Sequence, residues 1–292
     1  MGTGARDDWM ASQTRPRVLV GIDGSEDGLR AVRYGARIAQ RRGGVLHIVH
    51  AVDDAVLACA WGVVYDPSAL QEAGEHATRE AAQVALESGL TADQIHDEVL
   101  LGNGAAILVR LSQGAELLVV GRRSVSGLER MFIGSTSVAV SEAAHCPVVV
   151  ISAAATPGLT GNHGMIGVGV DVHEHSLTTL EWAFAEAAAR GSSLQVVHVQ
   201  KPAETLATDG TLANAAAHGI DSLIAPLREK YPAVQVDVQI ASGAPVDELL
   251  DRTGDLDLLV LGVQKPKLLG VRLGGVMRAV LAHATCPVAL VK

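Results

Sequence analysis

The feature that most constrains this chain is an internal repeat. Four segments of the first half recur in the second half, in the same order and at nearly constant spacing: Arg17–Asp23 as Met165–Asp171, Leu46–His50 as Leu194–His198, Glu116–Gly121 as Asp257–Gly262, and His145–Val150 as Thr285–Leu290. Matches of this kind at a fixed period indicate that one structural unit has been duplicated. The chain therefore has to be explained as two copies of one domain.

The repeat also predicts where the domains begin and end. A length of 292 residues exceeds the usual size of one domain and fits two domains of about 140 to 150 residues. We expect residues 1–15 to be a disordered lead-in and residues 16–154 to form the first domain. Residues 155–164, which contain Pro157-Gly158, form a linker, and residues 165–292 form the second domain.

Within each copy, short runs of Val, Ile and Leu alternate with Ala-rich segments of helical spacing. In the first half we expect helices at 26–41, 68–88 and 105–113, and a fourth that follows Gly134 and stops before Pro147. Aromatic residues make up only 3% of the chain, so the cores are built from aliphatic side chains. Strands that are apolar on both faces, with helices between them, predict parallel pairing. The expected fold class is α/β, with two tandem open parallel five-stranded sheets flanked by helices in a Rossmann-like arrangement.

Composition and motifs argue against several functional classes. A net charge of -9 without a long basic run argues against nucleic acid as a partner, and no apolar stretch is long enough to span a membrane. Three cysteines without a CxxC pair, and an N-terminus without a signal-peptide pattern, favour a cytoplasmic location. The P-loop, the GxGxxG fingerprint and the GxSxG elbow are absent. His173-Glu-His175 has no third ligand at sensible spacing, so no metal site is expected.

In an open parallel sheet, ligands bind beyond the carboxyl ends of the strands, so the residues that follow strands are the candidates. Asp23 follows the first strand, Gly121-Arg-Arg-Ser124 follows the fourth, and Gly134-Ser135 opens the next helix. A helix N-terminus favours an anion through its N–H groups and its dipole, which makes this loop a plausible phosphate cradle. The alternative for Asp23 is a turn or N-cap role, and the alternative for the arginines of this loop is solvated surface charge.

These motifs resemble those of a universal stress protein domain. The resemblance rests on Val20-Gly-Ile-Asp-Gly-Ser25, the strand ending in Gly121, Gly134-Ser135 and the closing Cys146-Pro-Val-Val-Val, and the second half is similar to a second such domain. It implies a tandem family member of the actinobacterial type with an adenine nucleotide α-hydrolase-like fold. It also implies ATP, with Mg²⁺, bound by a G-2x-G-9x-G-S/T loop.

Carried onto this sequence, the family's loop begins at Gly121 and ends at Gly134-Ser135, with Ser124 in place of its second glycine. By the same resemblance, Asp23 contacts the adenine, Ala51 lines the base or ribose, and Thr136 follows the phosphate-binding serine. The residues assigned to the first site are Gly21, Ile22, Asp23, Ala51, Gly121, Arg122, Arg123, Ser124, Arg130, Gly134, Ser135 and Thr136.

The second half keeps less of this pattern. Gly262 retains the first glycine and Lys265 replaces the second, while the end of the loop is either Gly275-Val276 or, aligned on Cys286-Pro287, Gly274-Gly275. Both alignments lack the hydroxyl, which nearby lysines and Arg272 could replace by charge. The residues assigned to this site are Gly169, Asp171, Val199, Gly262, Lys265, Gly274, Gly275 and Val276.

We find no nucleophile paired with a general base, so we expect a nucleotide-dependent regulator of stress adaptation and not an enzyme, with slow ATP hydrolysis at most a secondary activity. The alternative is a nucleotide-free interaction module that keeps only the fold. The apolar runs Val148–Ile151 and Val288–Val291 are expected to be sheet edges that pair. From these edges we expect the two halves to pack as a pseudo-symmetric pair and the chain to form a homodimer.

Overall fold

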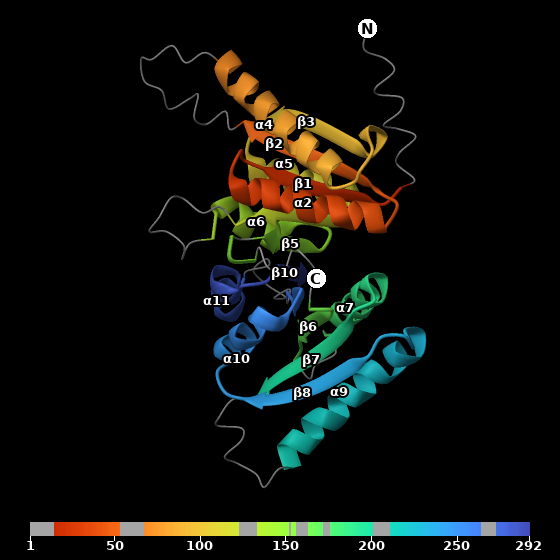
Figure 1. Ribbon diagram of the computed structural model, residues 1–292. Coiled ribbons are helices and arrows are strands. Elements are labelled where there is room, and N and C mark those ends of the chain that lie inside the picture. The colour runs from red at the N-terminus through yellow and green to blue at the C-terminus, as the bar shows by residue number, and fades with distance from the viewer. Residues whose placement is uncertain are drawn as a thin grey trace. The chain divides into compact units, whose positions relative to one another are not determined.

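A computed structural model of the chain describes residues 15–52, 67–122, 133–151, 153–155, 163–171, 176–200, 211–263 and 273–292 (Figure 1). These residues form two compact units, one up to residue 153 and one from residue 154 onward. We call them the first and the second unit and describe each by itself.

Both units contain a five-stranded parallel sheet. The first has β1 (Arg17–Ile22), β2 (Val45–Val52), β3 (Ile95–Leu101), β4 (Leu117–Gly121) and β5 (Val148–Ile151), in the order β3-β2-β1-β4-β5. The second has β6 (Met165–Gly169), β7 (Ser193–Gln200), β8 (Val236–Ser242), β9 (Leu258–Gly262) and β10 (Val288–Val291), in the order β10-β9-β6-β7-β8. The predicted fold class is confirmed.

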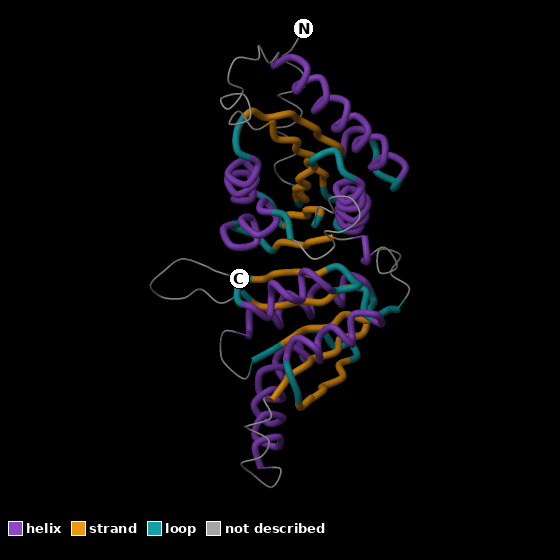
Figure 2. The backbone as a smooth tube through the Cα atoms, turned by 90° about the vertical axis from the view of Figure 1, so that its left-hand side faces the viewer, coloured by secondary structure: helices purple, strands orange, loops and turns teal. Residues whose placement is uncertain are grey.

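The central strands are buried on both faces, as expected of a parallel sheet whose crossover helices cover both sides. Val18, Leu19 and Val20 are consecutive and therefore alternate between the faces of β1, yet none of them is exposed. A sheet of this kind needs a layer of helices on each side. Figure 2 shows helices on both sides of the strands of the first unit.

Helices form these layers in both units, and those of the first unit lie close to the predicted positions. Those of the first unit are α2 (Glu26–Arg41), α4 (Pro67–Glu87), α5 (Gly104–Leu111) and α6 (Ser135–Ala143); those of the second are α7 (Ser176–Arg190), α9 (Thr211–Lys230), α10 (Pro245–Arg252) and α11 (Gly275–His283). Short 3₁₀ turns occur at Ala92–Gln94, Ser112–Gly114, Ala153–Ala155 and Thr253–Asp255. Within the described residues, none of the helices combines the length and the apolarity that crossing a bilayer requires.

The strand order determines where a ligand can enter the first unit. Because β1 lies between β2 and β4, the sheet reverses its direction of growth between β1 and β4. The connections after these two strands diverge there and leave a crevice at their carboxyl ends. A Cβ added to Gly121 would lie 2.7 Å from the carbonyl carbon of Asp27, so the end of β4 touches the start of α2.

Candidate functional site

A cavity of about 400 Å³ opens at the carboxyl ends of β1 and β4. Its walls come from five parts of the first unit: the end of β1, the end of β2, the start of α5, the end of β4 and the start of α6. The lining residues are Gly21, Ile22, Asp23, Val49, Ala51, Asn103, Gly104, Leu108, Val120, Gly121, Gly134, Ser135, Thr136 and Ser137. The structure thus brings together eight of the twelve residues that the sequence assigns to this site.

Asp23 stands at the rim of the cavity and forms the turn that follows β1. Its Oδ1 accepts a hydrogen bond from the backbone N–H of Ser25 at 3.1 Å, and Gly24 between them has φ +77°. Ser25 then caps α2 by accepting from the N–H of Gly28 at 3.2 Å. The turn role considered for Asp23 is therefore present, and it holds an exposed carboxylate in place at the entrance.

The first turn of α6 forms the opposite wall. Gly134 is the N-cap residue, and its own N–H donates to the carbonyl of Arg122 at 3.1 Å. Because glycine has no side chain, Gly134 makes no side-chain hydrogen bond that caps the helix. Ser135 and Thr136, which follow it, are exposed. The first N–H groups of a helix have no partner within the helix and carry the positive end of its dipole. This wall therefore favours an anionic group.

Ser137 ties this wall to the sheet, since its Oγ donates to the carbonyl of Gly121 at 2.8 Å. Gly121 itself is needed for packing, because a side chain there would collide with the backbone of α2. Of the four remaining predicted residues, only Arg122 lies within the described part of the chain, and it does not line the cavity. Arg122 is only 5% exposed, and burial lowers the pKa of its guanidinium while the nearby Asp27 opposes this shift; Arg123, Ser124 and Arg130 lie outside the described residues.

Several lining residues were not found from the sequence, and Asn103 is the most informative of them. Its side chain caps α5 by accepting from the N–H of Ala106 at 3.1 Å, and an added Cβ on Gly104 would lie 3.3 Å from Ala51. The sequence contains a pattern that indicates this position, since Gly102-Asn103-Gly104 follows the third apolar run just as Asp23 follows the first. Applying the strand-end rule to the third strand would have placed Asn103 and Gly104 in the site. The other lining residues not assigned were Val49, Leu108, Val120 and Ser137.

A second cavity, of about 300 Å³, adjoins the first and shares Asp23 and Ala51 with it. His50 lines it together with Gly24, Val52, Leu70, Ala73 and Ala77. Burial lowers the pKa of His50, and the negative charge of Asp23 partly opposes that shift. Asp23 and His50 therefore line the same cavity at the ends of β1 and β2.

The second unit presents the corresponding positions with different chemistry. Gly169 and Gly262 end the neighbouring strands β6 and β9, Asp171 follows β6 and is exposed, and Val199 is half-buried on β7. Helix α11 begins at Gly275 after its N-cap Gly274, and the side chain of Val276 is 38% exposed. The first turn of α11 therefore carries no hydroxyl group. Lys265, like the neighbouring Lys267 and Arg272, lies outside the described residues.

Comparison with known proteins shows that both halves of the chain match the same protein family. The model of the universal stress protein family matches residues 14–152 and again residues 164–292. A universal stress protein of Mycobacterium tuberculosis is 29% identical over 286 residues, which cover 93% of this chain and 95% of that protein. The relatives are named as universal stress proteins, a name that designates no reaction, in agreement with the expectation of a protein that is not an enzyme.

A solved structure that spans both units has the same fold. The crystal structure of a universal stress protein from Archaeoglobus fulgidus matches with a TM-score of 0.73 and 19% identity, covering 96% of this chain and 98% of that chain. A universal stress protein solved in complex with cAMP is 28% identical and covers 47% of this chain and 95% of that chain, with a TM-score of 0.36.

Proposed function

The chain belongs to the universal stress protein family, and from this premise we propose that it is an ATP-binding regulator that acts in stress adaptation. ATP, accompanied by Mg²⁺, binds in the 400 Å³ cavity of the first unit. The nucleotide acts by stabilising one conformation or partner surface over another, which requires different affinities for the two states.

The observation that carries this proposal is the cavity between Asp23 and the first turn of α6. Its volume lies within the range of small-molecule sites, and its two ends differ in chemistry as the two ends of a nucleotide do. The N–H groups of α6 and the hydroxyls of Ser135 and Thr136 receive the phosphates. Asp23, Val49 and Ala51 surround the base and the ribose at the other end.

We further propose that one nucleotide binds per chain, in the first unit. At the start of α11, Gly275 and Val276 occupy the places of Ser135 and Thr136, so the second unit lacks two of the donors that would hold a phosphate. We regard the second unit as a copy that keeps the fold without the nucleotide.

Native mass spectrometry of the freshly purified protein tests the proposal, with identification of any released small molecule. We expect one ATP per chain, or one that binds when Mg-ATP is added to empty protein. Protein that is empty and does not bind added Mg-ATP would contradict the proposal and support the nucleotide-free interaction module. Two nucleotides per chain would contradict the assignment of the second unit.

We also propose that the protein is cytoplasmic, in line with its cysteine content, and that it forms a homodimer through the sheet edges Val148–Ile151 and Val288–Val291. Light scattering at micromolar concentration measures the mass of the assembly directly. A monodisperse monomer would remove the dimer from the proposal and leave the nucleotide site untouched.

A further inference from the structure

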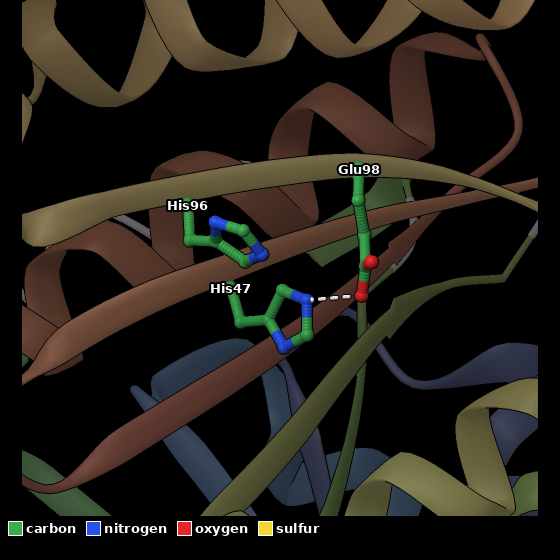
Figure 3. Close-up of side chains that lie close together, drawn as sticks. All are labelled: His47, His96 and Glu98. Atoms are coloured by element: carbon green, nitrogen blue, oxygen red, sulfur yellow. Dashed lines mark hydrogen bonds and ion pairs between the residues drawn. The ribbon is translucent and has the colours of Figure 1, made fainter. Parts of the chain in front are cut away.

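Two histidines and a glutamate that do not themselves line the cavity lie together on one face of the first unit's sheet. His47 lies on β2, and His96 and Glu98 lie on β3; Figure 3 shows both imidazole rings beside the Glu98 carboxylate. The Nε2 of His47 is 2.8 Å from Oε1 of Glu98, and the ring centroids of His47 and His96 are 4.9 Å apart. Each residue offers one donor atom such that all three atoms lie within 4.8 Å of one another.

The register of the two strands produces this cluster. His47 pairs with His96, and Val49 pairs with Glu98, so the three side chains occupy adjacent positions of the same sheet face. Because β3 ends the strand order of the first unit, one side of the cluster adjoins no further strand of that sheet. His47 is 2% exposed, whereas the Glu98 side chain is 31% exposed, so the cluster is buried at one end and accessible at the other.

We propose that His47, His96 and Glu98 bind a divalent transition-metal ion such as Zn²⁺, with a fourth position open to water. Imidazole nitrogens and a carboxylate are typical ligands of Zn²⁺, and three protein ligands plus one exchangeable ligand are typical of an open zinc site. Two imidazoles favour Zn²⁺ and its neighbours in the transition series over Mg²⁺ or Ca²⁺, which prefer oxygen.

The distances are compatible with such an ion. Ligands at tetrahedral corners of a zinc ion, with bonds of about 2.0–2.1 Å, are about 3.3 Å from one another. The His47–Glu98 pair is already closer than that, and the His96 donor atom, which lies within 4.8 Å of the other two, has to move toward them when the ion binds. The metal ion takes the place of the proton between His47 Nε2 and Glu98 Oε1, and in a neutral ring this proton moves to Nδ1, so that His47 binds the ion as a neutral imidazole.

The local charges include groups that favour binding of a cation and groups that oppose it. The hydrogen bond from His47 is the main reason that the pKa of Glu98 is lowered, which keeps this ligand ionised. The cations Arg17 and Arg110 are near enough to influence the pKa values of His96 and Glu98, and they oppose a further positive charge. We therefore expect a weaker affinity than that of a closed four-ligand structural site.

The second unit provides a natural comparison. By the same register, Gln195 on β7 occupies the place of His47, and Asp237 and Gln239 on β8 occupy the places of His96 and Glu98. There the Nε2 of Gln239 donates to Asp237 Oδ2 at 2.8 Å. Because no imidazole is present at these three positions, the two copies of one fold differ in the chemistry of this site.

The test uses the full chain, treated with a chelator, dialysed and kept free of added nucleotide, which would itself bind metal. ZnCl₂ is titrated by calorimetry, and Co²⁺ is added in a parallel experiment because its visible absorption reports coordination by nitrogen. We expect one ion per chain at this site. His47→Gln and Glu98→Gln introduce the residues that the second unit carries, and each is expected to weaken binding by at least about 100-fold, since even a lost outer-shell partner costs 10- to 100-fold.

The controls separate this site from other histidines. His76→Gln alters an exposed histidine of α4, and the double variant His173→Gln/His175→Gln removes the paired histidines near the start of α7; both should bind like the parent. Because Glu98→Gln retains a group that can hydrogen-bond to His47, this variant is expected to fold like the parent. Circular dichroism verifies the fold of each variant. Absence of Zn²⁺ binding, unchanged affinity in folded His47→Gln and Glu98→Gln, or loss in the His173/His175 variant would each overturn the proposal.

Discussion

Replacing Gly134 with leucine should abolish ATP binding while leaving the first unit folded. Gly134 lines the cavity at the N-terminus of α6, where the phosphates are proposed to sit. Its backbone has φ −58° and ψ 144°, a conformation that any L residue adopts. A side chain at this position therefore occupies the phosphate site without straining the backbone.

The magnitude follows from the hydrogen bonds that would be lost. A hydrogen bond to a charged group contributes about 1.5–3 kcal/mol, so excluding a phosphate from two N–H donors costs about 3–6 kcal/mol. This corresponds to a loss of affinity of about 10²- to 10⁴-fold. Replacing glycine at a compatible φ stabilises by about 0.4–1 kcal/mol through the unfolded state, and a poorer N-cap offsets a similar amount. We expect the free energy of unfolding to change by less than about 1 kcal/mol.

Calorimetric titration with Mg-ATP measures the affinity, and urea denaturation measures the stability. Gly274→Leu is the matched control, because Gly274 holds the same N-cap position in α11 with φ −64°, and an added Cβ meets nothing within 4 Å. This control should bind ATP like the parent. A folded Gly134→Leu variant that retains parental affinity would refute the placement of the phosphates at α6.

Three further outcomes test the packing and the ionisation of the described residues. Gly121→Ala should lower the free energy of unfolding by about 1–3 kcal/mol, because its Cβ would lie 2.7 Å from backbone of α2; Gly274→Ala should change it by less than about 0.5 kcal/mol, and equal urea midpoints for the two would contradict the close contact. Burial holds the pKa of His50 below its ordinary value of 6.5, so the folded state binds fewer protons than the unfolded state, and stability should fall as the pH drops through 6.5 toward the folded pKa. His50→Gln should lessen that fall between about pH 7.5 and 5.5, and an unchanged pH dependence of the urea midpoint would argue against it. Burial also raises the pKa of the Cys286 thiol to about 12, so a maleimide should label Cys286 only after unfolding, as peptide mass spectrometry can show; equal labelling of native and urea-treated protein would exclude this.

The fold was predictable because the apolar runs, the helical spacing and the helix caps all indicate the same arrangement. The run Val18-Leu-Val20 is apolar on both faces, and the Ala-rich segment after it has helical spacing; both point to a parallel sheet covered by helices. Helix ends were predicted within a residue or two where a cap defines them, as Ser25 does for α2. Duplication strengthened each inference, since every element had to be consistent with two sequences.

The candidate site was predictable only where a single segment carries it. Asp23 and Gly134-Ser135 stand at recognisable strand and helix ends, and both line the cavity. Arg122 shows the limit of such reasoning, because a basic residue in a loop gives no sign of which way it points. Its burial beside the acidic Asp27 depends on the contact between β4 and α2, which only the folded chain defines.

The cluster of His47, His96 and Glu98 depends still more strongly on tertiary structure. Forty-eight intervening residues separate His47 from His96, and the sequence does not specify which residue of β3 faces which residue of β2. A shift of the register by one residue would turn the β3 side chains to the other face, and the same composition would form no cluster. Neighbouring histidines such as His173-Glu-His175, which lie outside the described residues, are visible in a linear sequence. The proposed site has three ligands contributed by two strands, and a metal titration of His47→Gln against His173→Gln/His175→Gln decides between the two.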